Sequence, residues 1–302
     1  MTTSKINLQT LANSRFGVWL ALAVSKHTPP WLGYRIADLG AAITTARRNS
    51  PLVRALRANQ WVISGGGLTE KEIQRAVYEV LHQHTHGLYD FYHNLERPQE
   101  VLRRTDFDPS FAGLFEQVKS GQYPALFLTP HPSNFDLAGR SLALRGLNFQ
   151  VLSFPRPPSG YQLQNRIRME VGIEVTPMSI EATHRAKNRL RSGGVVLTGL
   201  DRPLADARLR PRFFGRPAPL PVAYVHLALQ CHVPMFVVAC VSPRPHLYRL
   251  VCSPPIWPQP HPDRDAELLM NAEAVLAEAE KIIRAYPRQW AMFYPVWPEV
   301  QV

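Results

Sequence analysis

The sequence predicts an α/β protein: a largely parallel central sheet flanked by helices on both faces, with a helical N-terminal segment. Three observations lead to this prediction. The first hundred residues show helical periodicity, short apolar runs alternate with amphipathic segments after residue 120, and Gly or Pro separates these segments. With 302 residues and 45% hydrophobic content, the chain can bury a sizeable core. We expect a single domain, 1–302, with a helical part (1–100) and an α/β core (120–300).

The N-terminal part contains an apolar run over residues 16–24, without a convincing signal cleavage site. The run is far shorter than the ~20 apolar residues that span a bilayer. Trp19 and Trp31, with Lys26 and Arg35, surround it in the manner of a segment lying in a membrane interface. An ordinary packed helix explains the same pattern, and the sequence leaves both interpretations open.

A long amphipathic helix is expected from Glu70 to about Leu95. Thr69 and Glu72 form a T-x-x-E capping box at its start, and apolar residues then recur at helical spacing.

This helix carries His82, His84 and His86. The i, i+4 spacing of His82 and His86 can chelate a metal, but no acidic residue joins them as in an H-E-x-x-H motif. We interpret the three as a surface cluster and predict no metal site.

Strand–helix alternation defines the core. Strands are expected at 125–129, 149–154, 173–176, 195–200, 233–241 and 247–252. Helices are expected from Asp136 to about Gly146 and at 161–171, 181–191, 222–230 and 266–285. In such a sheet the carboxyl ends of parallel strands share one edge, where ligands bind.

His131 and Asp136 lie where the first of these strands gives way to a helix, in Thr129-Pro-His-Pro-Ser-Asn-Phe-Asp136. A carboxylate beside a histidine can fix its tautomer, so that the other ring nitrogen accepts a proton from a hydroxyl. We expect Asp136 to turn back toward the imidazole, although a simple helix-terminal role explains the spacing equally well.

Asp201 ends a second strand, so the parallel sheet can bring it to His131, beside an apolar slot at the sheet edge. A turn-capping aspartate is the competing interpretation. Arg166 and Arg168 lie on a helix, and Arg202 opens a long basic loop; these side chains suit a phosphate, or simply a solvated surface.

Two adjacent aromatic residues, Phe213 and Phe214, stand in the same loop. They predict either contact with an apolar ligand or packing into the core. Trp290, Phe293, Tyr294 and Trp297 are expected to close the core near the end of the sequence.

The net charge of +11 suits an anionic partner such as acidic lipid headgroups, a phosphorylated co-substrate or nucleic acid. No nucleic-acid-binding module is visible, so we predict no nucleic-acid partner. Cys231, Cys240 and Cys252 match no zinc signature, and we expect buried free thiols.

Several blocks in consistent order, over roughly residues 15–300, resemble one family. They are Thr129–Asp136 as an H-x4-D/E block, Asn165–Gly172, Gly199–Arg202, Pro211-Arg-Phe-Phe-Gly-Arg-Pro217 and Tyr286-Pro-Arg-Gln-Trp290. The chain resembles the bacterial lipid A biosynthesis acyltransferases of the lauroyl/myristoyl type, including the phosphatidylinositol mannoside acyltransferases. The prolines flanking His131 and the sequence Ala291–Trp297 depart from the general pattern, which leaves the acceptor less defined than the reaction.

The resemblance implies acyl transfer from acyl-CoA or acyl-carrier protein to a hydroxyl of a glycolipid or phospholipid. It implies His131 as general base, Asp136 as the residue that orients it and Asp201 as support. Arg166, Arg168, Asn134 and Arg202 would contribute to substrate binding. No metal and no cofactor beyond the acyl thioester are implied, and the location would be the cytoplasmic face of the inner membrane, peripheral or N-terminally anchored.

Two other functions compete with acyl transfer. A lipid-binding, membrane-docking protein of the same fold would bind lipid without needing His131 or Asp136. A lipid-ester hydrolase is disfavoured because no G-x-S-x-G nucleophile elbow occurs in the sequence.

Overall fold

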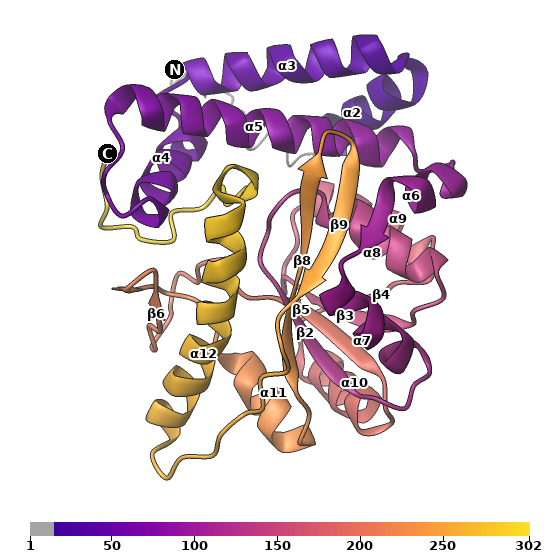
Figure 1. Cartoon of the computed structure of the whole chain (residues 1–302), viewed down its shortest axis with the longest axis vertical. Coiled ribbons are helices and arrows are strands. Elements are labelled where there is room, and N and C mark those ends of the chain that lie inside the picture. The colour runs from indigo at the N-terminus through magenta and orange to yellow at the C-terminus, as the bar shows by residue number, and fades with distance from the viewer. Residues whose placement is uncertain (1–14) are drawn as a thin grey trace, which may run out of the picture.

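The computed structural model describes residues 15–302 (Figure 1). The N-terminal helices are α2 (Arg15–His27), α3 (Pro30–Ala46), α4 (Pro51–Ile63), α5 (Glu70–His93) and α6 (Pro98–Arg104). The core helices are α7 (Pro109–Lys119), α8 (Phe135–Leu144), α9 (Ser159–Met169), α10 (Ile180–Arg191), α11 (Ala223–Cys231) and α12 (Arg264–Ala285). A short 3₁₀ helix, η1, covers Pro287–Gln289.

The central sheet has seven strands in the order β1-β9-β8-β2-β5-β3-β4. Their bounds are β1 (Thr105–Phe107), β2 (Ala125–Thr129), β3 (Phe149–Ser153), β4 (Glu174–Pro177), β5 (Val195–Gly199), β8 (Met235–Arg244) and β9 (Leu247–Cys252). Strands β8, β2, β5, β3 and β4 pair in parallel, whereas β9 runs antiparallel to β8. The largely parallel sheet that the sequence predicted is confirmed.

Helices cover both faces of this sheet. Alternate residues of β2 point to opposite sides, as the pleat requires. Leu126 and Leu128 join the core formed with α10, α11 and α12, whereas Phe127 joins the core formed with α7, α8 and α9. These two apolar cores hold the three layers together.

The N-terminal helices form a further layer across one end of the sheet. Figure 1 shows α3 and α5 lying beyond the end toward which β8 points, the end at which the parallel strands finish. The predicted capping box of α5 is present: the Thr69 hydroxyl accepts from the Glu72 amide, and the Glu72 carboxylate accepts from the Thr69 amide. A small hairpin of β6 (Arg212–Phe213) and β7 (Arg216–Pro217) lies outside the central sheet.

One edge of the sheet differs from expectation. Strand β1 and helix α7 were not predicted. The strand has three residues and pairs with β9 through Thr105↔Tyr248 and its neighbours. Only Thr105 of its three residues is buried, so the strand lacks the apolar run by which the other strands were predicted.

Candidate active site

His131 stands in the loop between β2 and α8. Pro130 and Pro132 flank it and exclude helical continuation on either side. Asn134 then caps α8, because its Oδ1 accepts a hydrogen bond from the Leu137 amide at 3.2 Å. The Nδ2 of Asn134 donates to the Gly87 carbonyl of α5 at 2.8 Å, which ties the loop to the N-terminal layer.

Asp201 reaches His131 because their strands are neighbours. Strands β2 and β5 pair in parallel with Thr129 opposite Gly199, so both chains leave the sheet at the same edge. His131 Nδ1 lies 2.5 Å from Asp201 Oδ1, and the His131 amide donates to Asp201 Oδ2 at 2.9 Å. The predicted approach of Asp201 to His131 is confirmed.

The carboxylate of Asp201 sets the tautomer of the imidazole. Since a carboxylate only accepts hydrogen bonds, Nδ1 is the nitrogen that carries a proton, and in the neutral imidazole Nε2 then presents a lone pair. Asp201 is fully buried, whereas 28% of the His131 side chain is exposed. Nε2 makes no polar contact within residues 15–302, so this nitrogen is available to a substrate hydroxyl.

Asp136 does not turn back toward His131, which corrects the expected geometry. Because α8 begins at Phe135, Asp136 lies in its first turn and faces α9. There its Oδ1 accepts from Arg168 Nε at 2.7 Å, and Arg168 also donates to Asn165 Oδ1 at 2.7 Å. Burial lowers the pKa of Arg168, but the adjacent Asp136 outweighs this effect and keeps the guanidinium charged.

Trp290 contacts the buried carboxylate of Asp201, and the sequence analysis did not predict this contact. Its indole Nε1 donates to Asp201 Oδ2 at 2.7 Å. The segment around it also binds the His131 loop: the Ala291 amide donates to the His131 carbonyl at 3.1 Å, and the Ser133 amide donates to the Gln289 carbonyl at 2.8 Å. Residues 289–291, hereafter the C-terminal strap, therefore fix both members of the pair.

Gly199 leaves the space in which the imidazole sits. A Cβ atom added to this residue would lie 3.3 Å from His131 Cε1, closer than ordinary contact. Backbone and ring thus approach so closely that a side chain at this position would require the imidazole to shift by a few tenths of an ångström.

The four predicted substrate-binding residues have different environments. Asn134 and Arg168 are engaged in the contacts given above. Arg166 is exposed on α9. The guanidinium of Arg202 lies 4.5 Å from the ring centroid of Phe154 and 4.4 Å from that of Tyr294, and it donates to the Tyr294 hydroxyl at 2.9 Å.

The two adjacent aromatics of the long loop pack into the core. Phe213 is fully buried and stacks on Trp297 at 5.7 Å between ring centroids, and Phe214 lies 6.4 Å from Trp290. Of the two interpretations, core packing is confirmed. The loop thereby supports the tryptophan that binds Asp201. All three cysteines are free thiols, as expected, but only Cys240 is fully buried.

His84 separates from the other two histidines of α5. Its ring lies 4.7 Å from that of Phe293, edge to face. Burial lowers the pKa of His84 to about 4, a shift that the charge of Asp136 only partly opposes. The side chain is therefore neutral near pH 7.

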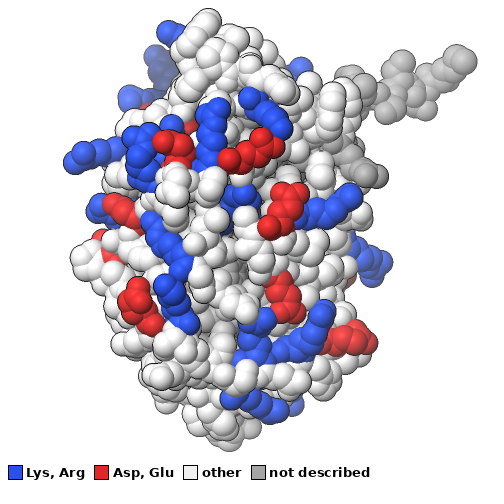
Figure 2. Space-filling view, turned by 90° about the vertical axis from the view of Figure 1, so that its right-hand side faces the viewer, with Lys and Arg blue, Asp and Glu red and all other residues white. Residues whose placement is uncertain are grey.

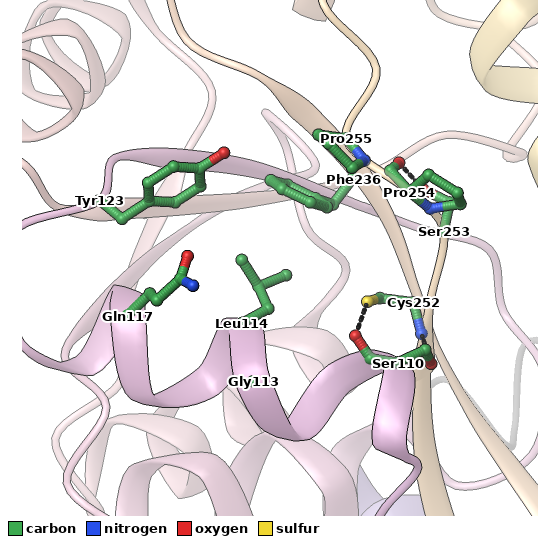
Figure 3. Close-up of a pocket in the computed structure, with 10 residues that line it drawn as sticks. All are labelled: Ser110, Gly113, Leu114, Gln117, Tyr123, Phe236, Cys252, Ser253, Pro254 and Pro255. Atoms are coloured by element: carbon green, nitrogen blue, oxygen red, sulfur yellow. Dashed lines mark hydrogen bonds between the residues drawn. The ribbon is translucent and has the colours of Figure 1, made fainter.

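A hollow of about 460 Å³ lies at the opposite end of the sheet. Figure 3 shows Leu114 and Gln117 of α7 facing Tyr123, which precedes β2, and Phe236 of β8, with Cys252 beside them. A second hollow lies between α11 and α12, around His226. Neither includes His131, so the apolar slot expected beside the imidazole stays a prediction.

The His131–Asp201 pair at the carboxyl edge of an α/β sheet is an arrangement that can accept a proton from a hydroxyl. Residues 14–299 match the family model described as bacterial lipid A biosynthesis acyltransferase. The chain therefore belongs to this family, which confirms the resemblance and the expected enzyme class, acyltransferase. The family implies acyl transfer to a lipid acceptor.

Two curated relatives show distant homology. Both are phosphatidylinositol mannoside acyltransferases of Mycobacterium tuberculosis, from strains ATCC 25618 / H37Rv and CDC 1551 / Oshkosh. Each is 26% identical to this chain over 181 residues, which cover 57% of this chain and 54% of the relative. The alignment thus spans about half the length of the curated relatives.

Proposed function

We propose that this protein is a membrane-associated O-acyltransferase that moves a fatty acyl chain from acyl-CoA or acyl-carrier protein to a hydroxyl of a glycolipid or phospholipid. The observation that carries the proposal is the His131–Asp201 pair, whose Nε2 is free on a partly exposed ring at the carboxyl edge of the sheet. The family supplies the chemical class, and the pair supplies a base for it.

His131 is the proposed general base. Its Nε2 takes the proton of the acceptor hydroxyl as the oxygen attacks the thioester carbonyl, which helps because a neutral hydroxyl is a weak nucleophile. Buried Asp201 stabilises the imidazolium that forms. When the tetrahedral intermediate collapses, the C–S bond breaks and the imidazolium returns its proton to the departing thiolate.

The first turn of α8 offers donors for the oxyanion. The Leu137 amide is capped by Asn134, but the amides of Phe135 and Asp136 have no acceptor within residues 15–302. Exposed helix N-terminal amides favour negative charge. We therefore assign the developing oxyanion to these two amides, close in sequence to His131.

Basic side chains are available for the phosphates of donor or acceptor. Arg166 is exposed and has no acidic side-chain partner within the described chain. The aromatic rings around Arg202 restrict the motion of its guanidinium, which suits a fixed phosphate contact. Arg168 acts instead through Asp136, as a largely buried ion pair that joins α8 to α9.

An exposed apolar patch on α2 and α3 supports docking to a lipid surface. Its large exposed side chains are Phe16, Trp19 and Leu20 of α2 and Trp31, Ile36, Leu39 and Ile43 of α3. Within residues 15–302, no helix has the length and apolar content needed to cross a bilayer. Figure 2 shows Lys and Arg side chains spread over one face of the molecule, with acidic side chains between them. An apolar helical face on a basic protein suits an interface rich in anionic lipid.

The central experiment incubates the purified protein with an acyl-CoA and a lysophospholipid or glycolipid acceptor, and follows acylated lipid by mass spectrometry. His131→Gln should abolish product formation and keep the unfolding midpoint. Product at the wild-type rate would overturn the assignment of the base. Free fatty acid as the main product would favour the hydrolase, and lipid binding without any conversion would favour the non-catalytic docking protein.

Docking is tested separately by sedimentation with anionic phospholipid vesicles. Replacing Trp31 and Leu39 with Asp removes two of the most exposed apolar side chains of α3 and should weaken vesicle binding. The matched control is Ile180→Asp, an equally exposed apolar residue on α10. Equal loss in both variants would contradict docking through α2 and α3.

A further inference from the structure

A second polar cluster joins helices α3 and α5 and is made of residues that do not contact His131. Asp38 of α3 faces His82 and His86 of α5. Asp38 Oδ1 lies 2.8 Å from His86 Nε2 and 3.1 Å from His82 Nε2. The acidic partner that the sequence of α5 lacks is thus supplied by a neighbouring helix, which spacing along one helix does not reveal.

Two distances between the ligand atoms are close to those that zinc requires, and all three atoms lie within 4.8 Å of one another. In a tetrahedral site with metal–ligand distances of about 2.0–2.1 Å, neighbouring ligand atoms lie about 3.3 Å apart. The two Asp38 contacts need to lengthen by half an ångström or less to reach that value. The imidazole rings of His82 and His86 are 4.0 Å apart between centroids and inclined by 30°, and both Nε2 atoms already converge on the same carboxylate oxygen.

We propose that Asp38, His82 and His86 bind one divalent transition-metal ion, with Zn²⁺ as the best match. Two imidazoles and one carboxylate are a known zinc donor set that leaves the fourth position to water. Among the described residues, this is the group of histidine, cysteine and acidic side chains whose ligand atoms converge closely enough for one ion. All three side chains are partly exposed, so an ion can enter from solvent.

Neighbouring side chains hold the two histidines in place. Tyr34 stacks on His86 at 5.0 Å between ring centroids, and the Tyr34 hydroxyl donates to Asp90 Oδ1 at 2.6 Å. Tyr78 packs against His82 at 5.8 Å. Supporting contacts of this kind restrict the orientation of ligand side chains before the metal binds.

The proposed metal site would join two helices, α3 and α5, that contact different parts of the molecule. α3 carries much of the exposed apolar patch, whereas α5 contacts the His131 loop, between β2 and α8, through Gly87 and Asn134. An ion between Asp38 and the two histidines would link the proposed docking helix to the helix that supports the active site. The metal has no part in the proposed acyl-transfer chemistry. A test of metal binding can therefore fail or succeed whatever the outcome of the acyltransferase test.

Isothermal titration of the chelator-treated full chain with ZnCl₂ tests the site. We expect one equivalent to bind to the wild type and the unfolding midpoint to rise with added Zn²⁺, since a ligand that binds the native state stabilises it. His86→Gln and Asp38→Asn should each weaken zinc binding by more than about 10-fold. Loss of a residue that only supports a ligand already weakens metal binding by at least about that factor. His184→Gln, which removes an exposed histidine of α10, should bind as the wild type does.

Each outcome decides for or against the site. Unfolding midpoints without metal establish that the variants fold. No binding to the wild type overturns the proposal, as does equal binding by His86→Gln and His184→Gln. One equivalent that survives in both ligand variants but disappears when the thiols are alkylated places the ion at a cysteine instead.

Discussion

Replacing Asp201 with Asn tests whether Asp201, rather than Asp136, is the carboxylate that orients His131. In the native pair, Oδ2 of Asp201 accepts from both the His131 amide (2.9 Å) and the Trp290 indole (2.7 Å), and Oδ1 faces His131 Nδ1. The oxygen of the new amide must occupy the Oδ2 position. The opposite orientation would leave buried donors facing donors, at about 1–3 kcal/mol for each unsatisfied group.

The NH₂ group of the introduced amide must then face His131 Nδ1 and donate to it. This contact reverses the tautomer: Nε2 becomes protonated and can no longer accept a proton from the substrate. The same change in hydrolytic triads lowers kcat by about 10⁴-fold, or roughly 5 kcal/mol of transition-state stabilisation. By the same reasoning we expect kcat to fall by about 10³–10⁴-fold here, with little change in KM.

The assay is the initial rate of thiol release from acyl-CoA in the presence of acceptor. Asp136→Asn is the matched control, because the same chemical change on the neighbouring carboxylate keeps an acceptor for Arg168 and should cost less than about 10-fold. The double variant His131→Gln, Asp201→Asn should be no slower than His131→Gln alone, since the two residues act as a unit. If Asp136→Asn is as inactive as Asp201→Asn, the assigned roles are wrong.

Three further expectations concern the surroundings of the pair. Trp290→Phe removes the donor to buried Asp201 and should lower the free energy of unfolding by about 1.5–3 kcal/mol in urea titrations. Gly199→Val should lower kcat by pushing the imidazole of His131 aside, whereas an unchanged rate would show that the ring has room. The lowered pKa of His84, about 4, means that between pH 6.5 and 4 the unfolded chain binds a proton that the folded chain does not. Stability should therefore fall by up to about 3 kcal/mol as pH decreases through this window, and His84→Gln should remove that dependence.

The meeting of His131 and Asp201 could be predicted from the positions of the two residues at the ends of predicted parallel strands. The sequence placed His131 and Asp201 after separate buried strands, and parallel pairing of adjacent strands brought them together. Asp136 was misplaced because four intervening residues do not reveal where α8 begins. With the helix starting at Phe135, the carboxylate turns toward α9 and Arg168.

The periodicity of the sequence predicts helices and strands, but it does not predict contacts between residues that are far apart in the chain. The bond from Trp290 to Asp201 joins residues 89 positions apart, and Asp38 meets His86 across 48. The spacing of His82 and His86 is compatible with chelation, but the sequence analysis interpreted them as a surface cluster, because the carboxylate of Asp38 comes from α3 and reaches them only through the packing of α3 on α5. The tryptophan in Tyr286–Trp290 was recognised as a family element, whereas its hydrogen bond requires the folded chain.

The C-terminal strap has a consequence for biosynthesis. His131 and Asp201 are translated well before residue 290. The hydrogen bonds of the Ser133 and His131 backbone and of the Asp201 carboxylate are complete only after Gln289–Ala291 have been translated and have packed. A nascent chain on the ribosome can therefore form β2 and β5 without a fixed imidazole. Under the proposed function, His131 would therefore reach the geometry of a working base only after this late segment has docked.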